Sequence, residues 1–137
     1  MAEDARAGHG LIDTSVVIDL DRIDAELLPR IVTVSALTMA ELAAGPHATG
    51  DAVERGRRQD RLQRAEATFD PLPFDAESAR AYGRIYAAVV ATGRKARGPR
   101  AVDLLIAATA LAANLPLYTR NIDDFRGLEQ LVTVVGI

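Results

Sequence analysis

The chain has 137 residues, enough for one domain with a single hydrophobic core and too few for two domains of ordinary size. Hydrophobic residues make up 49% and charged residues 26%, as in globular proteins, and no apolar run approaches the roughly 20 residues of a membrane span. There is no cysteine, which excludes disulfides, zinc–thiolate sites and cysteine nucleophiles, and the net charge of −3 argues against general nonspecific binding of nucleic acid. The N-terminus lacks the apolar segment of a secretory signal, so we expect a tail over residues 1–9, a domain over 10–137 and a cytoplasmic protein.

A short apolar strand is predicted near the N-terminus, with polar side chains directly after it. Residues 10–12 have strand character, Asp13 follows, and Thr14 or Ser15 can cap a helix over 16–20. Ligands of parallel α/β sheets bind outside the carboxyl ends of the strands, where strand order reverses, and the first strand normally borders that point. Asp13 is therefore the first candidate for chemistry, and the alternative is that it only caps the next helix.

A second strand is predicted over residues 31–34, followed by a helix over 36–44 with Ser35 as its cap. Glu41 shares one face of this helix with apolar neighbours at helical spacing. A carboxylate on an apolar face indicates a site, but the rest of the helix is also apolar, so the pattern fits an exposed Glu41 equally well.

The middle of the chain predicts two long helices, one that begins at Thr49 or Asp51 and ends at Phe69 and one over residues 75–92, joined by an edge strand or connector at 72–74. The first helix is densely charged, which favours a solvated face over the alternative of a surface for a partner or nucleic acid. Its basic residues are Arg55, Arg57, Arg58, Arg61 and Arg64. The apolar stripe expected on the second helix is Ala79, Tyr82, Tyr86 and Val89.

A basic loop over residues 94–100 precedes a helix over 103–113 that is apolar on every side and therefore predicted to be central and buried. Asp103 in its first turn is favoured by the helix dipole, which is a sufficient structural reason for the residue. The same position places a carboxylate at the rim of the core beside four cations that suit a phosphate backbone. These candidate RNA-binding residues are Arg94, Lys95, Arg97 and Arg100.

Two further strands are predicted at the C-terminal end, over residues 115–118 and 131–135, with a polar segment over 119–125 between them. The chain thus alternates strands with helices. This order is typical of an α/β fold with a mostly parallel central sheet, here of four to five strands, and helices on both faces.

Four acids, Asp13, Glu41, Asp103 and Asp124, each follow a strand or lie near the start of the next helix, so we expect them to share one edge of the sheet. Clustered carboxylates raise each other's pKa and require a cation. Oxygen ligands without Cys or a well-placed His suit Mg²⁺, or Mn²⁺ in its place, better than Zn²⁺. The chemistry that this arrangement predicts is metal-assisted hydrolysis of a phosphodiester, although acids at strand ends occur in many α/β proteins.

Four segments resemble, in order and spacing, the motifs of PIN-domain ribonucleases: 11–15 (Leu-Ile-Asp-Thr-Ser), 40–42 (Ala-Glu-Leu), 103–110 and 119–125. The resemblance runs from about residue 10 to the end and is greatest to VapC-type toxins of VapBC toxin–antitoxin modules. It implies a PIN fold and a Mg²⁺-dependent endoribonuclease toxin of a type II system. It also implies a homodimer that forms a hetero-oligomer with a cognate VapB-type antitoxin, whose C-terminal segment enters the acidic groove.

Carried over by position, the resemblance places the family's metal-site acids at Asp13, Glu41 and Asp103 and its pocket hydroxyls at Ser15 and Thr119. Where relatives often have a fourth Asp this chain has Asn121, and Asp124 supplies the nearby acid. The implied roles are metal anchors for Asp13 and Asp103, and completion of the ligand shell or orientation of the water for Glu41. Either Asn121 or Asp124 then contacts a second ion or the water.

Three other functions are weighed against this hypothesis. A metal-free ribonuclease commonly uses two histidines, but His9 begins the first strand, far from Asp13, and together with His47 makes a poor acid–base pair. A Mg²⁺-dependent phosphoacceptor signalling domain needs a lysine near a late strand end, whereas Lys95 precedes the buried helix. A catalytically silent PIN-like module that binds RNA or protein remains the third alternative.

Overall fold

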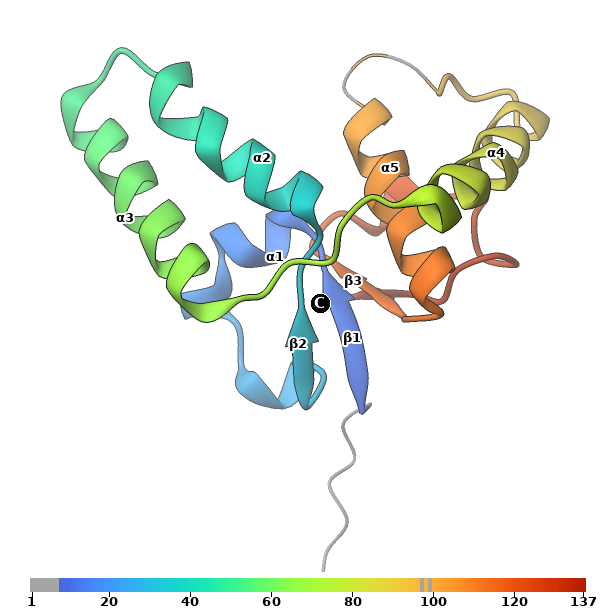
Figure 1. Ribbon diagram of the computed structural model, residues 1–137, viewed down its shortest axis with the longest axis horizontal. Helices are drawn as coiled ribbons and strands as arrows, with labels where there is room; N and C mark the ends of the chain where they lie inside the picture. Colours follow the sequence, from blue (N-terminus) through green and yellow to red (C-terminus); the bar gives the residue numbers. More distant parts are fainter. Residues whose placement is uncertain (1–7, 97, 99) are drawn as a thin grey trace, which may run out of the picture.

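A single sheet of parallel strands runs through the centre of the protein (Figure 1). The computed structural model describes residues 8–96, 98 and 100–137. Neighbouring strands are parallel and lie in the order β2-β1-β3-β4, with bounds His9–Ile12 (β1), Ile31–Thr33 (β2), Leu117–Thr119 (β3) and Val134–Gly136 (β4). The chain leaves β1 for β2 on one side and returns to β3 on the other, so strand order reverses between β1 and β3.

Helices cover both faces of this sheet, which confirms the α/β architecture predicted from the sequence. The helices are Thr14–Ile18 (α1), Ala36–Ala44 (α2), Ala52–Thr68 (α3), Ala76–Ala91 (α4) and Arg100–Ala113 (α5). Leu11 lies in one hydrophobic core with residues of α4 and α5, and its neighbour Ile12 lies in a second core with residues of α1, α2 and α3. Successive side chains of a strand point to opposite faces, so β1 contributes to both cores.

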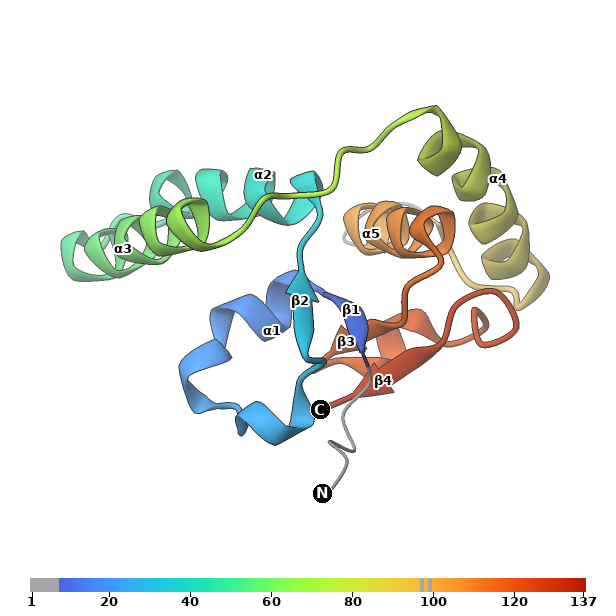
Figure 2. The ribbon, with the colours of Figure 1, turned by 60° about the horizontal axis from the view of Figure 1, so that its bottom comes forward.

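The two cores are built differently. Helices α4 and α5 lie together over one side of the sheet, whereas α2 and α3 form a hairpin that extends past its edge (Figure 2). Leu104 and the run 106–110 of α5 are buried, which confirms the predicted central helix. In the hairpin, burial is confined to fewer positions, such as Leu42 of α2 and Ala65 of α3.

The predicted boundaries of α2 and α4 agree with the structure within one residue, and so do those of α3 with Asp51 and not Thr49 as its start, because each helix begins with a side chain that satisfies an unpaired backbone N–H. These caps are Ser35, Asp51 and Asp75, which accept from the N–H groups of Thr38, Val53 and Ser78. Helix α5 begins at Arg100, before the predicted start at Asp103, so the last of the four basic residues is helical.

The apolar stripe predicted for α4 is wrong at Ala79 and Tyr86, which are exposed, and right at Val89, which is buried, and at Tyr82, which packs against the core while partly exposed. The residues that α4 buries are Ser78, Ala81, Ile85 and Val89. Tyr86 is 40% exposed and packs edge-on against Tyr82, with ring centroids 6.1 Å apart. A tyrosine can leave its hydroxyl in water at the rim of a core, so the smaller side chains face α5 instead.

The two predicted C-terminal strands form, but later in the chain than expected. Strand β3 begins at Leu117 instead of residue 115, and β4 begins at Val134 instead of 131. Leu131 is held in a turn by the carbonyl of Leu128, which keeps it out of the sheet. The predicted edge strand at 72–74 is reduced to one parallel bridge between Leu72 and Ser35.

The expected N-terminal tail lies outside the described residues as far as residue 7. Of its last two residues, Gly8 accepts a hydrogen bond from the N–H of Ile31, and His9 is the first residue of β1. None of the helices in the described part of the chain combines the length and apolar character needed to cross a membrane.

Candidate metal and active site

The candidate site lies where β1 and β3 end side by side. Asp13 directly follows β1, and its backbone N–H donates to the carbonyl of Tyr118 in β3 at 3.0 Å. Leu11 is in register with Leu117, and Ile12 with Tyr118, so Asp13 lies opposite Thr119 at the carboxyl edge. This is the point at which strand order reverses, where ligands of open α/β sheets bind.

Asp13 is 4% exposed and is the N-cap of α1, so the sequence-based expectation that Thr14 or Ser15 caps this helix is wrong. Its Oδ1 accepts from the N–H of Val16 at 3.1 Å and from the hydroxyl of Ser15 at 2.6 Å. A buried carboxylate needs such donors to remain charged. Capping and a place in the site are therefore compatible, because one oxygen carries both hydrogen bonds.

The hydroxyl of Ser15 joins the ends of β1 and β3. It donates its proton to Asp13, accepts from the N–H of Arg120 at 3.0 Å, and lies 3.5 Å from the Oγ1 of Thr119. Thr119 is fully buried and accepts from the N–H of Asn121 at 3.0 Å. The two hydroxyls that the sequence placed near the site therefore shape its floor by fixing the loop after β3.

Glu41 reaches the site from α2 and is half-buried. The hydroxyl of Thr14 donates to its Oε1 at 2.5 Å and is also hydrogen-bonded to the Oγ1 of Thr38, 3.1 Å away. Thr38 is fully buried and lies 3.4 Å from the hydroxyl of the cap residue Ser35. This row of hydroxyls gives the carboxylate of Glu41 a defined orientation toward α1.

The sequence analysis did not assign Thr14 and Thr38 to the site. A signal for Thr38 was present, since it precedes Glu41 by three residues on one helix and such residues are neighbours on the helix surface. The contact between Thr14 and Glu41 joins residues that are distant in the chain and depends on how α1 packs against α2.

Asp103 lies in the first turn of α5, where the charges of the other three acids act on it. Burial raises the pKa of its carboxyl to about 6, and the charges of Asp124, Asp13 and Glu41 add to the shift, while the guanidinium of Arg100 partly offsets it. Its carboxylate accepts no hydrogen bond from the described residues. The raised pKa of Asp103 thus reflects first its burial and then the negative charge of the three other acids.

These acids suit a hard divalent cation in donor type and in charge. All the donors are carboxylate oxygens, and a cation among them would relieve the repulsion that raises the pKa of Asp103. Within the described ranges, no three acidic or histidine side chains are already grouped closely enough to hold a metal ion. A cation bound by three of these acids would require their side chains to move closer together.

Asn121 and Asp124 occupy different places around Asp103. Asn121 is exposed and precedes the 3₁₀ turn Ile122–Phe125. Asp124 is half-buried in that turn, and its negative charge acts on Asp103. Of the two candidates, Asp124 is the one whose electrostatic effect on Asp103 is evident.

The basic segment 94–100 is partly occupied by contacts within the protein. Arg94 donates to the carbonyls of Asp123 and Arg126 at 2.9 and 3.3 Å, and Arg100 donates to the carbonyl of Asp124 at 3.1 Å. Lys95 is exposed, and Arg97 lies outside the described residues. Two of the predicted RNA-binding cations therefore bind the backbone next to Asp124.

Comparison with known proteins finds relatives over almost the whole chain. Residues 10–130 match the PIN domain model. The chain is 34% identical to ribonuclease VapC5 of Mycobacterium tuberculosis, over 91% of each chain, and 31% identical to ribonuclease VapC of Rickettsia bellii, over 88% of this chain and 91% of the relative. The crystal structure of VapBC-5 from M. tuberculosis, a member of the VapBC family of toxin–antitoxin systems, superposes with a TM-score of 0.83 at 32% identity, over 95% of this chain and 99% of the other.

Proposed function

The chain belongs to the PIN-domain family, and we propose that it is an endoribonuclease toxin of a type II toxin–antitoxin system. Its relatives at 34% and 31% identity are named ribonucleases and match almost their whole length. The observation that carries the proposal is the convergence of Asp13, Glu41, Asp103 and Asp124, which acts on the pKa of Asp103. We assign the domain to residues 10–137.

We propose Mg²⁺ as the metal, with Mn²⁺ able to replace it. Ribonucleases of this family are generally metal-dependent, and the four carboxylates are ligands of the kind that Mg²⁺ prefers. Asp13, Asp103 and Asp124 would hold the ion, while Glu41 completes the ligand set or holds the attacking water. When bound, such an ion lowers the pKa of a water and stabilises charge on the phosphodiester oxygens.

The protein's own side chains prepare the site. Val16 and Ser15 fix one oxygen of Asp13, so its second oxygen is the one available for a cation. Thr14 orients Glu41, and the position of Asn121 in the loop after β3 allows its amide to hold a water. Around this acidic edge, the basic segment offers contacts to an RNA backbone.

We further propose a cognate VapB-type antitoxin as the partner, with a homodimer of this chain in the toxin–antitoxin hetero-oligomer and the cytoplasm as the compartment. This rests on likeness to the VapBC-5 structure over nearly the whole of both chains. An acidic edge that a cation must neutralise also suits a partner segment carrying a positive charge.

The test is cleavage of total cellular RNA by the purified, partner-free protein. Parallel reactions contain Mg²⁺, Mn²⁺ or EDTA, and a further reaction uses the Asp103→Ala variant with Mg²⁺. We expect discrete fragments only with metal and with the intact acid. Intact RNA in every reaction, from protein shown to be folded, would favour a silent binding module. Labelling with a small phosphoryl donor would instead identify a phosphoacceptor domain.

A further inference from the structure

A trough runs between α1 and α3 from the candidate site toward the C-terminal end of α3. It consists of two adjoining cavities of ≈ 360 and ≈ 290 Å³. The first is lined by Thr14 and Glu41, and the second by Arg22, Arg64 and Phe69. Ile18 and Arg61 line both cavities and therefore mark where they meet.

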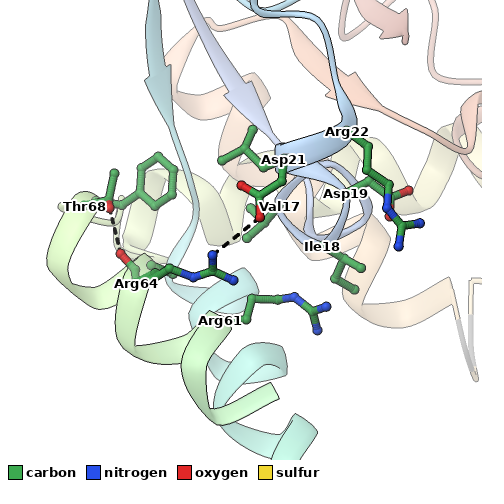
Figure 3. A pocket seen from close by; sticks show the side chains of 11 residues that line it. Val17, Ile18, Asp19, Asp21, Arg22, Arg61, Arg64 and Thr68 are labelled. Carbon is green, nitrogen blue, oxygen red and sulfur yellow. Dashed lines mark hydrogen bonds and ion pairs between the residues drawn. The ribbon is translucent and has the colours of Figure 1, made fainter. Parts of the chain in front are cut away.

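Arg61 is a cation without a partner in the described part of the chain. The other two arginines of α3 that line the trough are engaged: Arg58 pairs with Glu54 at 3.0 Å and donates to the carbonyl of Gly45, and Arg64 pairs with Asp21 at 3.4 Å. Figure 3 shows Arg61 beside Ile18, with no interaction drawn to its guanidinium group, and Arg64 directed at Asp21.

We propose that Arg61 binds a backbone phosphate of the RNA and that the α1–α3 trough carries the strand past Glu41. This rests on the proposed ribonuclease function. An RNA strand that approaches four carboxylates is repelled by them, so a flanking cation has to compensate, and a guanidinium suits a phosphate through paired N–H groups. The cations of the basic segment, Arg94 and Arg100, already bind backbone carbonyls.

Two apolar side chains in the largely polar lining of the trough favour a single strand over a duplex. Ile18 is 47% exposed between the two cavities, and the half-buried ring of Phe69 lines the second one. Unpaired bases can lie against apolar and aromatic side chains while their phosphates contact arginine. An A-form duplex keeps its bases stacked inside and cannot use such a surface.

The experiment compares Arg61→Gln with Arg57→Gln, a matched loss of charge on the same helix outside both cavities. Binding of a fluorescein-labelled single-stranded RNA of mixed sequence is titrated over a series of salt concentrations, in an Asp103→Asn background that leaves the RNA intact. We expect Arg61→Gln to weaken binding several-fold and to reduce the slope of log K against log salt by about 0.7, the value for one phosphate contact on a single strand. Arg57→Gln should leave the affinity for RNA and its salt dependence unchanged. Arg61→Lys, which keeps the charge, should retain most of the slope.

Cleavage by the corresponding variants with an intact Asp103 separates this inference from the proposed function. We expect Arg61→Gln to raise KM with little change in kcat, as for loss of a contact made equally in ground and transition states. If the wild-type protein cleaves RNA and Arg61→Gln matches it in KM and in salt slope, the inference is wrong. It is also wrong if Arg61→Gln binds RNA normally but loses inhibition by a co-expressed antitoxin. If the wild-type protein does not cleave RNA, the proposed function fails and the binding titration alone decides the role of Arg61.

Discussion

The end of β1 and the first turn of α5 each bring an aspartate to the candidate site, but in opposite circumstances. Asp13 is almost fully buried and accepts hydrogen bonds from Val16 and Ser15. Asp103 is more exposed, accepts none from the described residues, and has a pKa raised to about 6 by burial and by neighbouring acids. The carboxylate of Asp13 stabilises the native state by capping α1, whereas the charged carboxylate of Asp103 destabilises it.

Because of this difference, substitutions at Asp13 and Asp103 should affect catalytic activity and folding stability differently. Removing the Asp13 carboxylate removes a helix cap, so folding and chemistry should both suffer. Removing the Asp103 charge relieves repulsion from Asp124, Asp13 and Glu41, so chemistry should suffer while the metal-free fold gains stability.

The largest expected effect is that of Asp103→Asn on cleavage. If Asp103 binds the metal directly, as proposed, its replacement should reduce the rate by at least about 100-fold, because even the outer-shell partners of metal ligands contribute 10- to 100-fold. In EDTA at about pH 8 the same variant should melt at a higher temperature than the wild type, since the native carboxyl is then charged beside other acids. Calorimetry and a cleavage assay on one preparation test both statements. A variant that loses activity and melts lower would contradict the comparison.

The next effect is that of Thr14→Val, which removes the hydroxyl that orients Glu41 while keeping the shape of the side chain. We expect cleavage to fall by about tenfold, as for loss of an outer-shell partner of a ligand. Thr14→Ser should restore most of the rate. Thr109→Val is the control, because it removes a buried hydroxyl whose partner is a carbonyl of its own helix. An equal loss of activity in that control would assign the effect of Thr14 to general destabilisation.

Asp13 allows the cap and the charge to be separated by two substitutions. Asp13→Ala should lower the free energy of unfolding by about 1 kcal/mol, the usual cost of losing a side-chain N-cap. Asp13→Asn keeps an oxygen able to accept from Val16 and should remain close to wild-type stability. Both should lose cleavage. Urea denaturation in EDTA measures the free energy of unfolding of both variants. Equal values would mean that the hydrogen bond from Val16 to Asp13 does not stabilise the protein.

The smallest effect is the pH dependence of stability without metal. The pKa of Asp103 is raised from 3.8 to about 6 in the native state, so the native protein binds more protons than the unfolded chain between these values. Its contribution to stability is therefore favourable at low pH and declines as pH rises toward 6, with no further change above. Asp75 and Glu129 have lowered pKa values and act in the opposite direction.

Asp75 and Glu129 are present in both proteins, so their contributions cancel in the difference in melting temperature between Asp103→Asn and the wild type in EDTA. This difference should increase from about pH 4 to about pH 6 and then stay constant. A difference that is flat across the range would mean that Asp103 does not carry the excess charge of the site.

Local sequence was sufficient to predict most helices. Ser35, Asp51 and Asp75 mark helix starts because the side chain that satisfies the first N–H groups is adjacent in the chain. The buried face of α4 was not predictable in this way, since Tyr86 and Ile85 are both apolar candidates and only the position of α5 decides between them.

By itself, the sequence determined most helices and strands and the oxygen-only set of acids, because these depend on neighbouring residues and on composition. Tertiary structure alone decided that Thr14 meets Glu41, that Arg61 lines the same cavity as that glutamate with no partner among the described residues, and that the pKa of Asp103 is raised by its burial and by the other acids. The physical reason is distance along the chain. Burial and the energy between charges depend on how α1, α2, α3 and α5 pack, and no local pattern of residues encodes that packing.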